Sequence, residues 1–88
     1  MTVTVYVLSS VGIDKRYVGI TCDLVRRLRE HSSGATKAGQ LLGRFTVLHT
    51  EVLTSYKEAR AREKYLKSGV GREWLKKEYP RSWPASGG

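Results

Sequence analysis

The sequence predicts an α+β fold in which a three-stranded antiparallel sheet is flanked by helices. Two strand-like stretches open the chain, a third lies in its middle, and the remaining segments show the apolar spacing and caps of helices. The order strand, strand, helix, strand, helix, helix is typical of a small sheet with helices packed against it. With 88 residues, the chain has room for one domain with a single core. We expect residues 1–79 to form this domain and residues 80–88 to be a flexible tail.

The first two strands are expected to form a hairpin. Valines alternate with other side chains over residues 3–8, a turn rich in Ser and Gly follows at 9–14, and a second strand is expected over 15–21. A hairpin that is symmetric about the first half of this turn places Tyr6 opposite Tyr17. This register puts the two tyrosines on one face of the sheet.

A helix is expected directly after this hairpin. Thr21 or Cys22 is placed to cap it, Asp23 in its first turn suits the positive end of the helix dipole, and Gly34 ends it. The following segment, residues 32–43, is rich in Ser, Gly and Lys and is therefore expected to be a loop.

The second half of the chain is expected to hold one strand and two helices. The strand covers residues 44–52, and Ser55 with Glu58 has the spacing of a capping box that opens a long helix. Glu58 also precedes Arg62 by four residues, the spacing of a solvated ion pair. A shorter helix over 71–79 follows, and its apolar side chains close the core.

The charge balance indicates a polyanionic partner. Sixteen Lys and Arg against eight Asp and Glu leave a formal charge of +8, spread along the chain. No apolar run approaches the roughly 20 residues that cross a bilayer, and the N-terminus does not resemble a signal peptide, so we expect a cytoplasmic protein without a membrane partner. A single cysteine, Cys22, excludes an internal disulfide and makes a zinc finger implausible.

The first helix carries a candidate phosphate ligand. At about 100° per residue, Leu24, Leu28 and His31 share one stripe, Arg27 lies at its edge and Arg26 points away. Arg27 is therefore the inward arginine. Two interpretations stay open for it: a phosphate ligand, or a side chain that lies along the margin of the core and pairs with a carboxylate.

A carboxylate interrupts the apolar stripe of the second helix. Tyr56, Ala59, Glu63 and Leu66 share this stripe, so Glu63 stands where an apolar residue is expected. It has an ordinary explanation, an i,i+4 ion pair with Lys67. The alternative is a ligand for a hard cation such as Mg²⁺ at the rim of a basic groove.

Gly19 lies two residues after Tyr17 and therefore on the same face of its strand. It removes a side chain where a helix or a ligand must approach closely. Tyr6 and Tyr17 by themselves could simply pack in the sheet, as strand tyrosines usually do. Two tyrosines on one face beside a helix that bears Arg27 are less usual than a single packed tyrosine.

Taken in order, these motifs resemble the GIY-YIG endonuclease superfamily, especially its small stand-alone bacterial members. The resemblance covers about residues 3–79. It is carried by TVY at 4–6, YVG at 17–19, Thr21, Asp23, Arg27, His31, and Glu63 in the run AREKYLKSG. Each tag is weak alone, but the ordered set is specific.

The resemblance implies metal-dependent hydrolysis of a nucleic-acid phosphodiester. In this interpretation Tyr6 is the general base for the attacking water and Tyr17 helps to position the water or the phosphate. Arg27 stabilises charge on the phosphoryl group, and His31 supports the tyrosine or the phosphate. Glu63 holds one divalent ion, Mg²⁺ or Mn²⁺.

The sequence departs from the family pattern at the first tag, which reads TVY rather than GIY, at Val18 in place of Ile, and in having no asparagine. Many larger members carry a separate DNA-binding domain that this chain lacks, so its own basic surface, or a protein partner, must hold the substrate. Candidates for that surface are Lys15, Arg16, Arg26, Lys37, Arg44, Lys67 and Arg72.

We therefore predict an endonuclease that acts on DNA in preference to RNA and selects for shape rather than sequence. The alternative is a non-catalytic nucleic-acid-binding module with the same fold. A third interpretation, an adaptor for an acidic protein, rests on charge alone.

Overall fold

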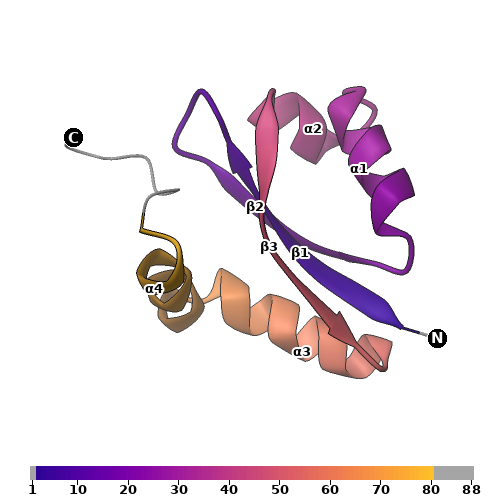
Figure 1. Ribbon diagram of the computed structural model, residues 1–88, viewed down its shortest axis with the longest axis vertical. Coiled ribbons are helices and arrows are strands. Elements are labelled where there is room, and N and C mark those ends of the chain that lie inside the picture. The colour runs from indigo at the N-terminus through magenta and orange to yellow at the C-terminus, as the bar shows by residue number, and fades with distance from the viewer. Residues whose placement is uncertain (1, 81–88) are drawn as a thin grey trace.

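The structure is a computed structural model that describes residues 2–80. It contains three strands and four helices: β1 (Val3–Ser10), β2 (Arg16–Thr21), α1 (Leu24–Ser32), α2 (Lys37–Leu42), β3 (Phe45–Leu53), α3 (Tyr56–Lys67) and α4 (Gly69–Glu78). The predicted α+β arrangement is confirmed (Figure 1). Residues 81–88, nearly all of the expected tail, lie outside the described part. None of the helices within residues 2–80 has the length and apolar character needed to cross a bilayer.

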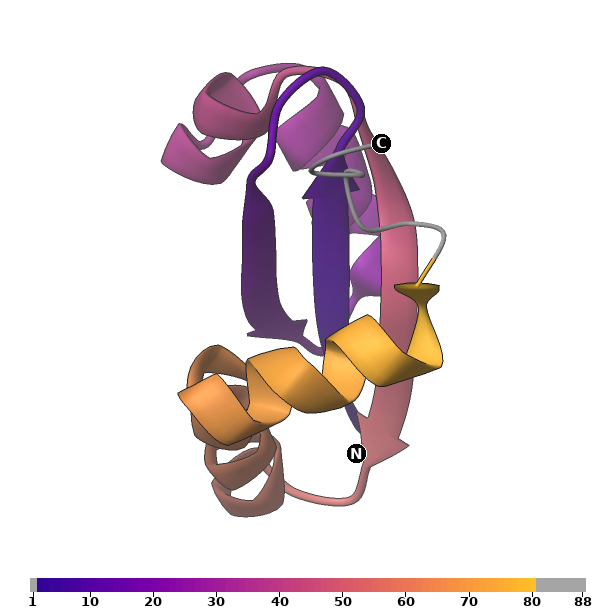
Figure 2. The same cartoon turned by 90° about the vertical axis from the view of Figure 1, so that its left-hand side faces the viewer.

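The sheet has the order β2-β1-β3, and both neighbours of β1 run antiparallel to it. Helices cover both of its faces (Figures 1 and 2). Val5 and Val7 point to the core under α3 and α4, whereas Tyr6 and Leu8 point to the core under α1 and α2. Because β1 has a strand on each edge and helices on each face, its side chains are almost completely buried.

The expected register of the first hairpin is wrong by two residues. Tyr6 pairs with Gly19, and Tyr17 pairs with Leu8. The centre of the hairpin therefore lies one residue later than expected, because β1 extends to Ser10 and β2 begins only at Arg16. A slip of two residues leaves every side chain on its face. Tyr6 and Tyr17 consequently still share one face, as diagonal rather than direct neighbours.

The region around α1 differs from the prediction in its cap and in the segment after it. Asp23, rather than one of the two preceding residues, caps α1, because its side chain accepts the N–H of Arg26 at 3.1 Å. The segment 32–43 is not all loop. It contains α2, which Thr36 caps and which buries Leu42 in the core. It covers this face of the sheet together with α1.

At the start of α3, Ser55 accepts the N–H of Glu58 at 3.2 Å, which confirms the predicted cap. The expected pair between Glu58 and Arg62 is wrong. Arg62 instead donates three hydrogen bonds to Glu51 on β3, from Nε at 2.8 and 3.1 Å and from Nη2 at 2.9 Å. A half-buried carboxylate on a neighbouring strand outcompetes one exposed on the same helix, because water screens the second more strongly. Ser68 ends α3 and also caps α4, which starts earlier than expected.

Candidate active site

A buried hydrogen-bonded chain links β1, α1 and α2. The Tyr6 hydroxyl lies 2.9 Å from Nε2 of His31, and Nδ1 of His31 lies 2.6 Å from Oγ1 of Thr36. The Thr36 oxygen also accepts the N–H of Gly39 at 2.9 Å, which holds it in place. Burial lowers the pKa of His31, and the nearby positive charge of Arg27 lowers it further. His31 is therefore a neutral imidazole at pH 7, with both nitrogens engaged.

The two tyrosines and His31 form one aromatic cluster on the α1 face of the sheet. Ring centroids lie 6.1 Å apart for Tyr6 and Tyr17 and 5.4 Å apart for Tyr17 and His31. A methyl group on Gly19 would lie 2.5 Å from Oη of Tyr6 and 2.8 Å from Cε2 of Tyr17. The space beside Gly19 is thus taken by the tyrosines themselves, not by a helix or a ligand.

Arg27 lies at the edge of this cluster. Its Nη1 donates to Oε1 of Glu30 at 2.9 Å, and its interactions with Glu30 and then with Tyr6 raise its pKa. Arg26 is 77% exposed, as the helical spacing predicts. Both interpretations of Arg27 therefore hold in part: it pairs with a carboxylate, and its guanidinium also interacts with the Tyr6 hydroxyl. With 39% of its side chain exposed, it remains accessible to a ligand.

Tyr6 and Tyr17 differ in their access to solvent. Tyr6 is completely buried, and burial raises its pKa to about 12 although Arg27 opposes the shift. Tyr17 is only half-buried and lines an open pocket of about 550 Å³. The Tyr17 hydroxyl also interacts with that of Tyr6. Tyr17 is therefore the tyrosine that a ligand in the pocket can touch directly.

Glu63 lies on α3, which packs against the opposite face of the sheet. Its side chain is 24% exposed, and Oε2 lies 3.3 Å from Nζ of Lys67, the ordinary i,i+4 pair. Lys67 in turn lines the same pocket as Tyr17. The pocket follows the edge of β2, so it connects the side of the sheet that carries Tyr17 with the helix that carries Glu63.

The residues fit a divalent ion only if substrate supplies further ligands. Within residues 2–80 no group of three or more His, Cys, Asp or Glu is placed to hold a metal. Mg²⁺, however, is commonly held by one or two carboxylates, substrate phosphates and several waters. The partly exposed carboxylate of Glu63, next to a cation-lined pocket, suits that mode. Whether Glu63 binds metal stays a prediction.

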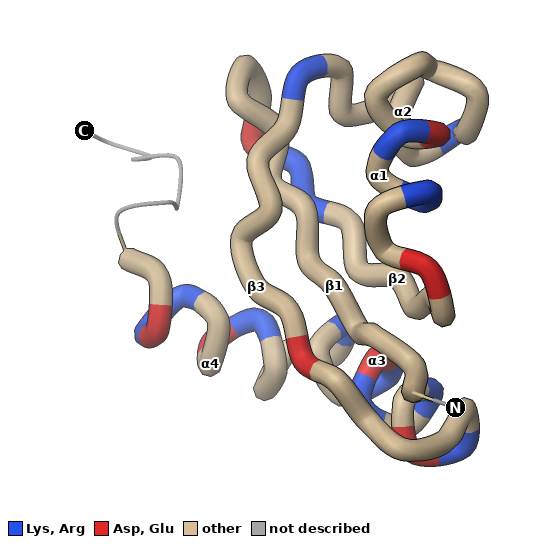
Figure 3. Tube along the Cα trace, turned by 45° about the vertical axis from the view of Figure 1, so that its right-hand side comes forward, with Lys and Arg blue, Asp and Glu red and all other residues tan. Residues whose placement is uncertain are grey.

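The structure separates the seven predicted nucleic-acid-binding cations into groups. Lys and Arg positions are spread over the helices, the start of β2 and the loops, and β1 and β3 contain none (Figure 3). Arg26, Lys37 and Arg44 lie away from the pocket beside β2. Four of the seven line it: Lys15, Arg16, Lys67 and Arg72.

The sequence interpretation missed two residues of the cluster, Glu30 and Thr36. Glu30 follows Arg27 by three residues, a spacing at which helical side chains meet, so the ion pair could have been found. Thr36 precedes Gly39 by three residues and could have been recognised as a helix cap. Its contact with His31 depends on how α2 packs and has no signal in the sequence.

Fold and site together define a basic α+β domain with a tyrosine, histidine and arginine cluster beside a cation-lined pocket, a combination suited to phosphate chemistry. A model of the GIY-YIG catalytic domain matches residues 3–78. The chain belongs to the GIY-YIG family, and this membership supports a nuclease-like function. The predicted recognition is confirmed.

A solved structure has a similar fold. The chain is similar to the UPF0213 protein BH0048 from Bacillus halodurans, whose structure was solved in solution by NMR. The two share 28% identity with a TM-score of 0.54, over 96% of this chain and 89% of that one. A search of curated proteins found no match.

Proposed function

We propose that the protein is a divalent-metal-dependent endonuclease that hydrolyses phosphodiesters in nucleic acid, DNA in preference to RNA, and selects for shape rather than base sequence. One observation carries the proposal: Tyr6, Tyr17, Arg27 and His31 come together from two strands and a helix, and Tyr17 opens onto a pocket lined by cations. The net charge of +8 supports a polyanionic substrate.

Arg27 is the proposed phosphate ligand. Its guanidinium has five N–H donors, and the interactions with Glu30 and Tyr6 leave others available to a ligand. The ion pair holds the side chain in place before substrate arrives, which reduces the entropy lost on binding. Charge-assisted hydrogen bonds from arginine to a phosphoryl group are most valuable where negative charge increases in the transition state. Arg27 is placed to supply them.

The burial of Tyr6 favours a relay over a free phenolate. A pKa of about 12 makes ionisation at pH 7 cost about 7 kcal/mol. In our proposal the hydroxyl of Tyr17 accepts a proton from the attacking water. Tyr6 accepts a proton from Tyr17 and passes its own to Nε2 of His31, while Nδ1–H of His31 donates to Thr36. The neutral state of His31 leaves Nε2 free to accept this proton.

Glu63 is the proposed metal ligand. A bound Mg²⁺ or Mn²⁺ would neutralise negative charge on the phosphate and on the leaving oxygen. Glu63 must release Lys67 for this purpose, and the exposed ammonium of Lys67 then becomes available to phosphate. The pair therefore keeps the carboxylate compensated until substrate and ion arrive.

The test is a cleavage assay on branched, flapped, single-stranded and duplex DNA, and on RNA of the same sequence, with and without Mg²⁺ or Mn²⁺. Arg27→Ala and Glu63→Gln should lose cleavage. Arg29→Ala and Glu73→Ala are matched controls, because both alter an exposed charge on a helix outside the cluster and should cleave normally. Two unrelated sequences of each shape separate selection for shape from selection for sequence.

Two results would count against the enzyme. Binding of DNA without metal-dependent cleavage of any substrate would favour the non-catalytic binding module. Cleavage that Arg27→Ala retains at the wild-type rate would show that hydrolysis does not use this cluster.

A further inference from the structure

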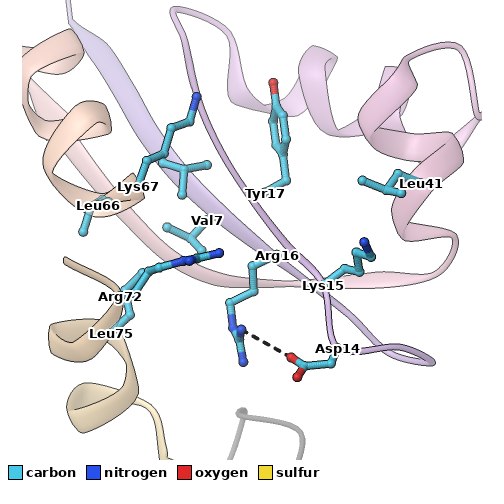
Figure 4. A pocket seen from close by; sticks show the side chains of 11 residues that line it. Val7, Asp14, Lys15, Arg16, Tyr17, Leu41, Leu66, Lys67, Arg72 and Leu75 are labelled. Atoms are coloured by element: carbon cyan, nitrogen blue, oxygen red, sulfur yellow. Dashed lines mark ion pairs between the residues drawn. The ribbon is translucent and has the colours of Figure 1, made fainter. Parts of the chain in front are cut away.

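The pocket beside β2 extends away from the tyrosine cluster into a region to which the proposed chemistry gives no role. Tyr17 lines the part of the pocket that adjoins the candidate active site. The cations come from α3 (Lys67), α4 (Arg72), β2 (Arg16) and the loop before β2 (Lys15) (Figure 4). At about 550 Å³, the pocket has the size of a ligand site.

Positive charge dominates the rim of this pocket. Four cationic residues line it against one carboxylate, Asp14, whose Oδ1 lies 3.6 Å from Nη1 of Arg16. Figure 4 shows Arg72 and Lys67 reaching from the helices towards β2, on which Arg16 stands. The Arg16 side chain is only 16% exposed, so it is held by the surrounding protein. Cations crowded in one pocket repel each other unless an anion lies between them.

Arg16 is largely separated from water, so neighbouring charges affect it strongly. Burial lowers the pKa of Arg16, Asp14 opposes the shift, and the positive charge of Arg72 lowers the pKa further. Two guanidinium groups therefore influence each other inside the pocket. An anion with several oxygens relieves this repulsion, because planar guanidinium groups match phosphate geometry.

The pocket adjoins the proposed site of cleavage at Tyr17. Tyr17 has one side against His31 and Tyr6 and also lines the pocket. A strand whose phosphate contacts Tyr17 and Arg27 must continue in one direction or the other. The pocket offers a cation-lined path along β2 in one of them.

We propose that this pocket binds a phosphate group of the nucleic-acid strand other than the one that is cleaved, with Arg16, Lys67 and Arg72 as its ligands. The proposal rests on the proposed function for the nature of the substrate. The second contact fixes the strand at two points, so the phosphate at Tyr17 is positioned as well as bound. Arg26, Lys37 and Arg44 have no part in this subsite.

Arg72 gives the cleanest test because it is exposed, so its replacement should not disturb the core. Binding of a fluorescent DNA duplex and of its single strand is measured by anisotropy without divalent metal, so that no cleavage occurs. Arg72→Glu should bind at least about 10-fold more weakly than wild type. Arg72→Ala should lower the slope of log affinity against log salt by about one.

Lys77→Glu is the matched control. It makes the same change of charge on α4, but Lys77 lies about 140° around the helix from Arg72 and does not line the pocket. It should lose little affinity. Equal losses in the two variants would overturn the proposal, because net charge alone would then explain binding, and so would wild-type affinity in Arg72→Glu.

The same experiment separates this proposal from the proposed function. If wild type binds DNA in an Arg72-dependent manner but cleaves nothing, the subsite stands and the nuclease fails. If wild type cleaves DNA and Arg72→Ala has the wild-type KM, the nuclease stands and the subsite fails. If wild type binds no nucleic acid, both fail. A raised KM in Arg72→Ala, with or without a lower kcat, supports both.

Discussion

Replacement of Gly19 by alanine tests whether the tyrosine cluster is packed as described. The new methyl group would lie 2.5 Å from Oη and 2.7 Å from Cζ of Tyr6, and 2.8 Å from Cε2 of Tyr17. All three distances are too short for carbon contacts, so the rings must move. Tyr6 is completely buried and hydrogen-bonded to His31, so movement of its ring must displace neighbouring side chains.

The magnitude follows from three contributions. Overpacking of a core costs about 1 to 3 kcal/mol. Loss of the hydrogen bond between Tyr6 and His31 adds about 1 kcal/mol. Alanine restricts the unfolded chain and returns about 0.4 to 1 kcal/mol. We therefore expect Gly19→Ala to lower the free energy of unfolding by about 1 to 3.5 kcal/mol. Displaced hydroxyls should also reduce cleavage by about 10²-fold.

Urea unfolding measures the first effect and single-turnover cleavage the second. Gly12→Ala is the matched control, because a methyl group there meets nothing within 4 Å and Gly12 has no positive φ. It should be as stable as wild type or more stable by up to about 1 kcal/mol, because only the effect on the unfolded chain remains. If Gly19→Ala is as stable and active as Gly12→Ala, Tyr6 does not pack against Gly19 and the geometry of the cluster is wrong.

Three further predictions concern the buried chain from Tyr6 to Thr36. Between pH 10 and 12 the unfolded state releases the Tyr6 proton more readily than the folded state, so wild type should lose about 2 kcal/mol more stability than Tyr6→Phe in urea unfolding. Because the pKa of His31 is lower in the folded state, acidification below about pH 6.5 protonates His31 in the unfolded state first. Wild type should therefore lose stability on acidification, and His31→Gln should lose less in the same assay. Thr36→Val should be destabilised by at least about 1 kcal/mol, because it removes a cap and leaves a histidine nitrogen unpaired, whereas Thr36→Ser should be close to wild type by thermal unfolding.

The parts of the fold that depend on local spacing could be predicted from the sequence. Alternation in the strands places Tyr6 and Tyr17 on one face, and this result does not change when the register shifts by two residues. Rotation of about 100° per residue in a helix separates Arg27 from Arg26. The same rule placed Glu63 on the buried side of its helix, where it is partly covered.

Features that depend on tertiary packing could not be predicted. The position of the turn sets the register of the hairpin, and the alternation of side chains in the strands does not reveal that position. The partner of Arg62 is Glu51, eleven residues away on a strand, and helix spacing cannot reveal it. The complete burial of Tyr6 follows from the central position of β1, which becomes known only when the third strand is placed beside it.

The central claim is that the cluster of tyrosines, His31 and Arg27 cleaves phosphodiesters. The most direct measurement is the single-turnover rate of DNA cleavage with saturating protein and Mn²⁺ or Mg²⁺, for wild type, Arg27→Ala and the exposed control Arg29→Ala. We expect wild type and Arg29→Ala to cleave at the same rate, and Arg27→Ala to be slower by about 10²-fold or more although it still binds DNA. Equal rates in all three would contradict the account, as would the absence of cleavage by the folded wild-type protein on every DNA shape.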